Sequence, residues 1–275
     1  MEAVSVIRLL VDDPLPGVRN MAVDEALMRS AGSGAAGVTL RFYRWEPGCL
    51  SFGRNQEARG TYDPDAAADR GVDVVRRPTG GRAVYHHREL TYSVTAPAGS
   101  WGSLRETYRR INRALAAGLR ELGVSAVCAA DESHVAGRSP SSRPTPRPTS
   151  RPCFRDPLPG EVTVDGRKLV GSAQWRDGGA FLQHGSILLV DEQQVVDALR
   201  ATGRGAAAGV DSGAISLADL LDELPPEGAL LDALTFGFER EFGVDVVPGT
   251  LSAEEAAASE SLAPRFADPA WTWRR

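Results

Sequence analysis

The chain has 275 residues, of which 42% are hydrophobic and 24% are charged, a composition typical of a water-soluble globular protein. A net charge of −5 argues against a nucleic-acid-binding surface, and the absence of a run of about 18 apolar residues argues against a membrane span. The N-terminus does not resemble a secretory signal, and three cysteines without a close pair favour a reducing, cytoplasmic setting over a disulfide framework.

The first half of the chain predicts several strands and one helix before residue 97. Asn20 is the expected N-cap of a helix over residues 20–31. The segments 38–45 and 49–53, separated by Pro47-Gly48, predict a hairpin. Strands are also expected at 4–13, at 72–77 and at 82–96, the last two on either side of a glycine pair.

The clearest helical pattern covers residues 103–123, where Ser103 and Glu106 form a capping box and leucines recur at helical spacing. Residues 125–130 predict a short strand. The Pro-, Ser- and Arg-rich stretch at about 134–152 has almost no apolar residues, and we interpret it as a flexible loop within one domain of residues 1–275.

The second half opens with a three-strand meander over 161–190, with turns at Asp165-Gly166 and Asp177-Gly178-Gly179. Helices are expected at 192–202, 216–225 and 228–243, and a capping box begins another helix at Ser252. Strands in the middle with helices around them favour an α+β fold with mixed or antiparallel sheets over a repeating βαβ array.

Three segments carry side chains suited to chemistry. Arg76 and Arg77 precede the pair Gly80-Gly81, where missing β-carbons allow a ligand to approach the backbone; the alternative is an ordinary turn with solvated arginines. Lys168 lies on a predicted strand, where alternation places it on the same face as Val170; most lysines are simply solvated.

Cys153 follows the Pro- and Arg-rich stretch, outside any predicted core element. A nearby cation would increase its thiolate fraction, and the strand of Lys168 follows closely enough for the two to meet. The alternative is an incidental exposed thiol. Cys49 and Cys128 lie in apolar strands, and we interpret both as core residues. The four histidines lack zinc-like spacing, and adjacent His86 and His87 would point to opposite faces of a strand, so no structural metal is expected.

Together these segments resemble the lipoate–protein ligase/octanoyltransferase family, whose catalytic domain is shared with biotin protein ligases. The matching segments cover most of residues 16–190 and include "LRFYRWEPGCLSFGRNQ", "VVRRPTGGRAVYHHRELTYSV", "RPCF" and "DGRKLVGSAQWRDGGAFLQHGSILL". Within the family the chain looks most like the LipM-type octanoyltransferases, because a Cys-Phe pair stands shortly before the lysine strand.

The resemblance implies an acyltransferase, a lipoyl(octanoyl) transferase, with a biotin/lipoate protein ligase-like domain. Cys153 would take an octanoyl group from octanoyl-acyl carrier protein as a thioester. The group would then pass to a lysine of a lipoyl domain or of the glycine cleavage H protein. Lys168 would contact the acyl carbonyl, and a substrate-binding set would line the acyl pocket: Arg76, Arg77, Gly80, Gly81, His86, Gly171 and Ser172.

Acyl transfer from a thioester to an amine needs no external energy source, so no cofactor and no ATP are expected. It needs a nucleophile, a proton carrier and donors for an oxyanion. Cys153, Lys168 and backbone amides near Gly80-Gly81 or Gly171 could supply them. Lys168 could act as a base if neutral, or as a cation that favours thiolate if charged.

Three alternatives share these features. An ATP-dependent lipoate–protein ligase would use the same fold and lysine to make an acyl-adenylate. An octanoyl amidotransferase between lipoyl proteins would differ only in its donor. A non-catalytic carrier-binding module would keep the surface without the chemistry. We also hypothesise that arginines between His134 and Arg155 steer acidic carrier proteins toward Cys153.

Overall fold

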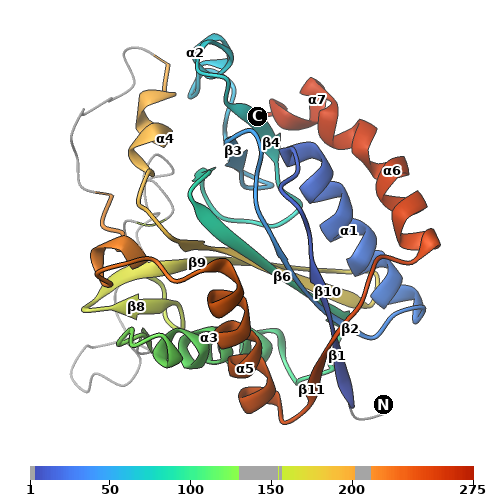
Figure 1. Ribbon diagram of the computed structural model, residues 1–275. Helices are drawn as coiled ribbons and strands as arrows, with labels where there is room; N and C mark the ends of the chain where they lie inside the picture. The colour runs from blue at the N-terminus through green and yellow to red at the C-terminus, as the bar shows by residue number, and fades with distance from the viewer. Residues whose placement is uncertain (1–3, 130–153, 155–156, 202–211) are drawn as a thin grey trace, which may run out of the picture.

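A large mixed sheet of eight strands forms the centre of the protein, in the order β11-β1-β2-β6-β10-β9-β8-β7 (Figure 1). The computed structural model describes residues 4–129, 154, 157–201 and 212–275. Strands β11, β1 and β2 run parallel to one another, whereas the strands from β2 through β6, β10, β9 and β8 to β7 pair antiparallel. The strands of this sheet are β1 (Val6–Val11), β2 (Val38–Tyr43), β6 (Glu89–Pro97), β7 (Val127–Cys128), β8 (Val162–Val164), β9 (Arg167–Asp177), β10 (Ala180–Leu188) and β11 (Asp245–Pro248).

A second, smaller sheet has the order β4-β3-β5. Its strands are β3 (Cys49–Phe52), β4 (Asp73–Arg76) and β5 (Val84–His86), with β3 parallel to β4 and antiparallel to β5. The predicted hairpin of 38–45 with 49–53 is therefore wrong. Both strands exist, but β2 pairs with β1 and β6 while β3 finds its partners in the other sheet.

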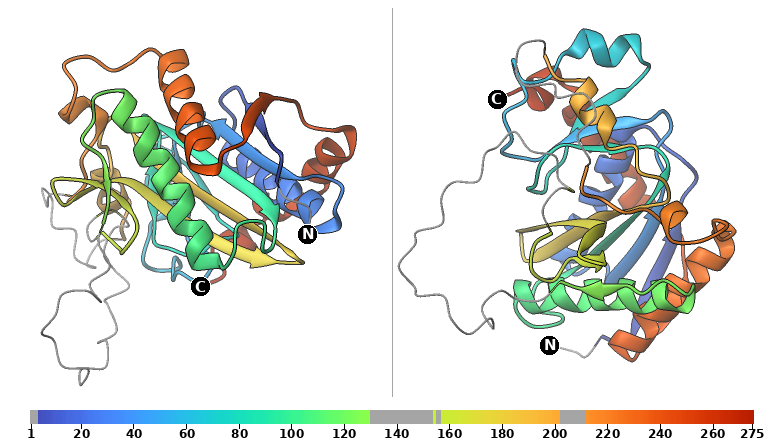
Figure 2. Two further views of the ribbon diagram at one scale, coloured as in Figure 1. Left: turned by 90° about the horizontal axis from the view of Figure 1, so that it is seen from below. Right: turned by 90° about the vertical axis from the view of Figure 1, so that its left-hand side faces the viewer.

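Two helix pairs cover opposite faces of the large sheet (Figures 1 and 2). Helices α3 (Leu104–Glu121) and α5 (Glu227–Phe242) pack side by side on one face, and α1 (Gly17–Ser33) and α6 (Ala253–Ala267) pack together on the other. The shorter helices are α2 (Pro64–Asp69), α4 (Gln194–Ala198) and α7 (Pro269–Thr272). The α+β architecture with flanking helices confirms the predicted fold class. None of the helices in the described ranges has the length and apolarity to cross a membrane.

Local sequence signals predicted several elements well. Ser103 caps α3 and Glu106 completes its capping box, and Ser252 with Glu255 does the same for α6. The meander β8-β9-β10 turns at the predicted glycines. Besides the hairpin, three predictions fail: Pro16 is the N-cap of α1 in place of Asn20, only the 3₁₀ turn Leu217–Asp219 forms within 216–225, and the strand expected at 82–96 divides into β5 and β6, which belong to different sheets. The predicted loop at 134–152 lies outside the described residues.

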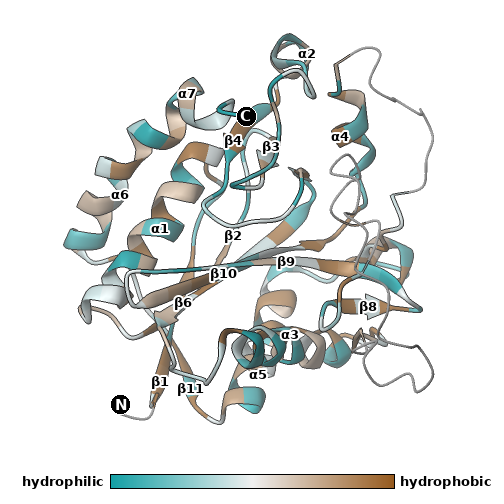
Figure 3. Cartoon of the chain, turned by 180° about the vertical axis from the view of Figure 1, so that it is seen from behind, coloured by the Kyte–Doolittle hydropathy of each residue, from teal (hydrophilic) through white to brown (hydrophobic). Residues whose placement is uncertain are grey.

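The two faces of the large sheet differ in polarity although both are buried. On β6, Leu90, Tyr92 and Val94 belong to the main hydrophobic core under α3 and α5. The alternate positions Glu89, Thr91, Ser93 and Thr95 face the α1 side, and all four are buried. Strand β2 shows the same alternation, and β10 contributes His184 and Ser186 to the α1 side. In Figure 3 these strands lie between α3 and α5 below and α1 above. The α1 side of the sheet is therefore a buried polar layer, whose groups need hydrogen-bond partners inside the protein.

Helices α3 and α5 approach closely enough to require glycine at their crossing. A β-carbon at Gly237 would lie 2.2 Å from the carbonyl oxygen of Ala114 and 2.6 Å from the amide nitrogen of Gly118. Gly228, near the start of α5, has no neighbouring atom within 4 Å of an added β-carbon. The two glycines of α5 therefore differ in the space that is left for an added β-carbon.

We predict opposite effects of alanine at these two positions. Gly237→Ala should destabilise the protein by about 1–3 kcal/mol, because overpacking outweighs the gain in helix propensity. Gly228→Ala, the matched control, should leave stability unchanged or raise it by up to about 1 kcal/mol. Urea unfolding followed by circular dichroism measures both, and equal effects would contradict the close helix contact.

Candidate active site

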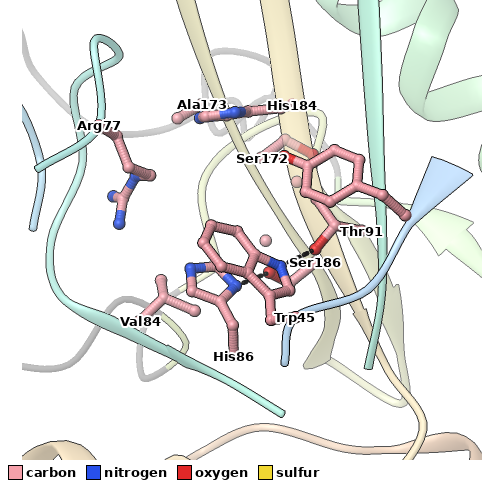
Figure 4. A pocket seen from close by; sticks show the side chains of 12 residues that line it. Trp45, Arg77, Val84, His86, Thr91, Ser172, Ala173, His184 and Ser186 are labelled. Carbon is pink, nitrogen blue, oxygen red and sulfur yellow. Dashed lines mark hydrogen bonds between the residues drawn. The ribbon is translucent and has the colours of Figure 1, made fainter. Parts of the chain in front are cut away.

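A cavity lies between the polar layer of the large sheet and the small sheet, next to α1 (Figure 4). Its volume is about 30 Å³, well below the usual range for ligand pockets. Strands from both sheets therefore contribute to one site. The lining residues are Tyr43, Trp45, Arg77, Val84, His86, Thr91, Gly171, Ser172, Ala173, His184, Gly185 and Ser186.

One end of the cavity is built around the buried carboxylate of Glu89. His86 Nδ1 lies 2.7 Å from Glu89 Oε1, and Thr91 and Ser186 donate to the same oxygen at 2.6 and 3.0 Å. The indole of Trp45 stacks on the His86 ring at 4.1 Å and donates to Thr91 Oγ1 at 2.7 Å, as Figure 4 shows. This end presents ring faces to the cavity, and the bonds converge on Glu89 Oε1 while Oε2 is buried without a hydrogen-bond partner among the described atoms.

Asp24 of α1 anchors the other buried carboxylate of the polar layer. It is fully buried and accepts hydrogen bonds from Arg41 at 2.8 Å, Tyr43 at 2.9 Å and Ser93 at 2.8 Å. His184 Nδ1 lies 3.0 Å from Asp24 Oδ2. Burial alone would raise the pKa of Asp24, but the hydrogen bond with His184 and the charge of Arg41 hold it below its ordinary value.

Burial lowers the pKa of His184, and its bond to Asp24 opposes this shift only in part. His184 is therefore neutral near pH 7, with the hydrogen on Nδ1 facing the carboxylate. Its Nε2 is left as an acceptor for the hydroxyl of Thr79, 2.7 Å away. The network thus runs from α1 through a cavity-lining histidine to the loop that carries the glycine pair.

The glycine-pair loop is held against the small sheet by Arg77. Its guanidinium donates to the backbone oxygens of Ser51 and Arg82, both at 2.8 Å, and of Gly80 at 3.2 Å. The loop approaches β3 so closely that a β-carbon at Gly53 would lie 2.0 Å from the Gly81 oxygen. Arg77 therefore both shapes the loop and lines the cavity.

Arg76, although adjacent, points to a different part of the protein. Its guanidinium donates to the carbonyl oxygens of Gly53 and Gln56 at 2.7 and 2.8 Å, and of Trp271 and Thr272 at 3.1 and 2.9 Å. It does not line the cavity. Arg76 instead ties the 53–56 loop to the C-terminal helix α7.

Lys168 is buried and paired with Glu161. Its Nζ lies 2.7 Å from Glu161 Oε1, and both side chains are 1% exposed. The same nitrogen is 5.2 Å from the centre of the Phe154 ring. Phe154 in turn packs on Gly171, where a β-carbon would lie 2.8 Å from its ring. A single ring thus separates the lysine from the Gly171 wall of the cavity.

Ser172 connects the cavity to the hydrophobic side of the sheet. Its hydroxyl donates to Asn112 Oδ1 of α3 at 3.1 Å and lies 2.7 Å from the Tyr92 hydroxyl, which also accepts from Gln183 at 3.0 Å. Because the Ser172 hydroxyl is used in these bonds, Ser172 contributes to the site by shaping the cavity wall.

The structure brings only some of the predicted site residues to the cavity. Arg77, His86, Gly171 and Ser172 line it. Arg76, Lys168, Gly80 and Gly81 stand behind or beside it, and Cys153 lies outside the described residues. Sequence reasoning missed further residues. Polar positions of otherwise apolar strands could have indicated Tyr43, Thr91, His184 and Ser186, whereas no comparable signal marks the lining residue Trp45 or Asp24 of α1, which bonds His184.

The predictions for the other cysteines and histidines have mixed outcomes. Cys49 is fully buried, as expected, whereas Cys128 lies on the edge strand β7 and is only half-buried. His86 is buried while the side chain of His87 is 45% exposed and lies beside Glu192, so the two do face opposite ways.

Comparison with known proteins defines the class of this protein. Residues 16–239 match the family model of the lipoyl protein ligase A/B catalytic domain. Because the match covers most of the chain, the protein belongs to this family. The fold agrees: a lipoate–protein ligase A bound with ATP has a TM-score of 0.75 over 99% of both chains at 23% identity. A bipartite ligase from Thermoplasma acidophilum has a TM-score of 0.73, covering 99% of this chain and 96% of the other at 23% identity.

Sequence relatives narrow the class to acyltransferases. The octanoyltransferase LipM of Kyrpidia tusciae is 40% identical over 93% of this chain and 94% of its own length. LipM of Symbiobacterium thermophilum is 38% identical over 98% of both chains. With such relatives along nearly its whole length, the protein is an acyltransferase enzyme of this family.

We predict that His184 makes the stability of the protein depend on pH. In the unfolded chain its imidazole takes up a proton near pH 6.5, whereas the buried ring resists it, so stability falls as pH drops through that value. The slope from this one group is at most about 1.4 kcal/mol per pH unit.

His184→Gln should flatten the dependence of the unfolding free energy between about pH 7 and pH 5. Urea denaturation at a series of pH values measures it. His87→Gln, which removes an exposed imidazole, is the control and should keep most of the wild-type slope. A wild-type slope in His184→Gln would contradict the proposed neutral state of the buried ring.

Proposed function

We propose that the protein transfers an octanoyl group from octanoyl-acyl carrier protein, through a thioester on Cys153, to a lysine of a lipoyl domain or of the glycine cleavage H protein. The relatives named octanoyltransferase LipM support the group transferred. A solved structure similar in fold is a bipartite lipoate–protein ligase studied with its E2 lipoyl domain, which supports the acceptor class.

The observation that carries the proposal is the position of Phe154. This ring is fully buried between Lys168 and Gly171, at the wall of the cavity. Cys153 is its covalent neighbour, and the Cα atoms of consecutive residues are about 3.8 Å apart. We infer that a nucleophile attached to this anchor acts at the cavity lined by Gly171, which we call the acyl cavity, next to the buried ammonium of Lys168.

The reaction divides into two transfers that need no ATP. The Cys153 thiolate attacks the donor carbonyl, the new thioester forms, and the bond to the carrier sulfur breaks, so that the carrier leaves as a thiolate and takes a proton from solvent. The neutral amine of the acceptor lysine then attacks the enzyme thioester, an amide forms, the cysteine leaves, and the amine proton is released to solvent. The donor thioester is already activated for acyl transfer, so the cysteine can form its own thioester from it without ATP.

Lys168 acts in this scheme as a cation. A buried amine 2.7 Å from a buried carboxylate is held in its charged form, because an ion pair offsets the cost of burial. A charged ammonium cannot accept the thiol proton. It favours the thiolate and the negative charge on the carbonyl oxygen through electrostatic attraction.

We predict that Cys153 carries the acyl group. After incubation with octanoyl-acyl carrier protein, intact-mass measurement should show one octanoyl adduct on the wild type and none on Cys153→Ser. Transfer to a lipoyl domain should fall by at least about 1,000-fold in that variant, since the covalent route is lost. Cys128→Ser, the control, should be acylated normally.

Other outcomes identify the other candidate functions. An unmodified wild type that lipoylates its acceptor only with ATP is a ligase. Acylation by an octanoylated lipoyl protein but not by the acyl carrier indicates an amidotransferase. No transfer under any of these conditions indicates a carrier-binding module.

We further predict that the charge of Lys168 sets the pH dependence of acylation. Removing one partner of a buried pair destabilises proteins by about 3–5 kcal/mol, so the informative variant is Lys168→Met combined with Glu161→Gln. Its acylation rate should rise with pH around the ordinary thiol value of about 8.5, and the wild-type rate should rise at lower pH. Rapid-mix mass spectrometry across pH measures both, and coincident profiles would rule out a role for the cation.

A further inference from the structure

A second cavity, of about 680 Å³, lies beside the glycine-pair loop and outside the site described above. It is open and polar, and its walls come from the loop after β3, the glycine-pair loop and the C-terminal residue. The lining residues are Asn55, Gln56, Glu57, Arg59, Gly81, Arg82 and Arg275.

The side chains around this cavity are mostly basic. Three arginines, Arg59, Arg82 and Arg275, line it together with two carboxylates, that of Glu57 and the terminal carboxylate of Arg275, whose oxygen accepts from the amides of Ala58 and Arg59. Two more arginines, Arg54 and Arg274, lie behind these three. Arg274 donates a hydrogen bond to the backbone oxygen of Arg54. On a protein with a net charge of −5, this is a local concentration of guanidinium groups.

The arginines behind this cavity are crowded. Burial and the charges of Arg274, Arg275 and Arg77 lower the pKa of Arg76 to about 10. Burial and the charges of Arg54 and Arg275 likewise lower the pKa of Arg274. Neither Arg76 nor Arg274 lines the cavity, so their guanidinium groups add positive charge behind its wall.

The second cavity and the acyl cavity share one wall. A β-carbon at Gly81, which lines the second cavity, would lie 3.1 Å from the Arg77 guanidinium and 3.9 Å from the Ala173 β-carbon. Arg77 and Ala173 both line the acyl cavity. The glycine-pair loop therefore stands between the two spaces, and a chain leaving the acyl cavity over this loop enters the arginine-lined one.

We propose that the arginine-lined cavity binds the phosphate group of the phosphopantetheine arm that carries the acyl donor, an inference that rests on the proposed function. Guanidinium groups bind phosphate oxygens in a planar, two-pronged geometry, and the side-chain amide of Asn55 is suited to a remaining oxygen. The Gln56 amide is bonded to Gly53 and Tyr62 and shapes the wall. A concave site admits a group on a flexible arm, whereas the acidic surface of a folded carrier is convex.

The distances fit this arrangement. Gly171, under Phe154, and Ala173, under the glycine-pair loop, are two residues apart on β9, which is about 7 Å. The arm between phosphorus and thioester sulfur is about as long as four extended residues, about 15 Å. An arm whose thioester lies beside Phe154 therefore reaches past the loop into the cavity.

The test compares binding of phosphopantetheine and pantetheine, which differ only in the phosphate, by titration calorimetry. The wild type should bind the phosphorylated arm about tenfold more tightly, as expected for one or two charge-assisted hydrogen bonds. Arg59→Ser combined with Arg82→Ser should abolish the difference, and the single Arg59→Ser should reduce it. Arg240→Ser, which removes an exposed arginine of α5, is the charge-matched control and should keep it.

Equal affinity for the two arms in the wild type, or an unchanged ratio in the double variant, would overturn the inference. If the double variant raises the KM for octanoyl-acyl carrier protein but leaves the phosphate preference intact, the arginines bind the acidic carrier surface instead. The titration requires no catalysis. Failure of Cys153 to become acylated therefore contradicts the proposed function, and loss of the phosphate preference contradicts this site.

Discussion

The structure depends on burying a polar face of its central sheet. An antiparallel sheet usually leaves its polar face in water, but here α1 and the small sheet cover it. Each buried hydroxyl, imidazole and carboxylate must then find a partner within the protein, since an unpaired one costs about 1–3 kcal/mol. Asp24 and Glu89 supply most of these partners, each accepting several hydrogen bonds from the strands around it, although Glu89 Oε2 itself has none among the described atoms. The bonds to the two carboxylates fix the positions of the cavity walls.

The same requirement explains why loops can shape a rigid site. The glycine-pair loop is bonded through Thr79 to His184 and through Arg77 to the small sheet. Arg76 holds the neighbouring loop to α7, which is about 200 positions away in the chain. A site placed on such tethered loops needs little reordering when a substrate binds, which favours both affinity and rate. The arginines recruited for tethering also leave positive charge at the surface beside the acyl cavity.

Family membership sets the fold, but the chemistry depends on a few positions of this chain. Solved relatives with this architecture include ligases bound with ATP. The local feature that the structure shows is the Phe154 ring, which lies between the Lys168 ammonium and the Gly171 wall of the cavity. Gly171 is needed because any side chain there would displace the Phe154 ring. Strand β9 therefore positions both the lysine and the cavity wall.

The sequence by itself determined the features whose causes are local. The capping boxes of α3 and α6, the turns of the β8-β9-β10 meander and the α+β class all follow from residues a few positions apart. Motif resemblance likewise indicated the family and four of the residues that line the cavity. Only the tertiary structure decided which strand β3 pairs with, that Asn20 binds the backbone of Arg44 instead of capping α1, and that Arg76 faces α7. It also supplied Glu161 as the partner of Lys168 and His184 as the partner of Asp24. These outcomes depend on buried polar groups meeting across different elements, and no pattern within one segment records which partner burial will provide.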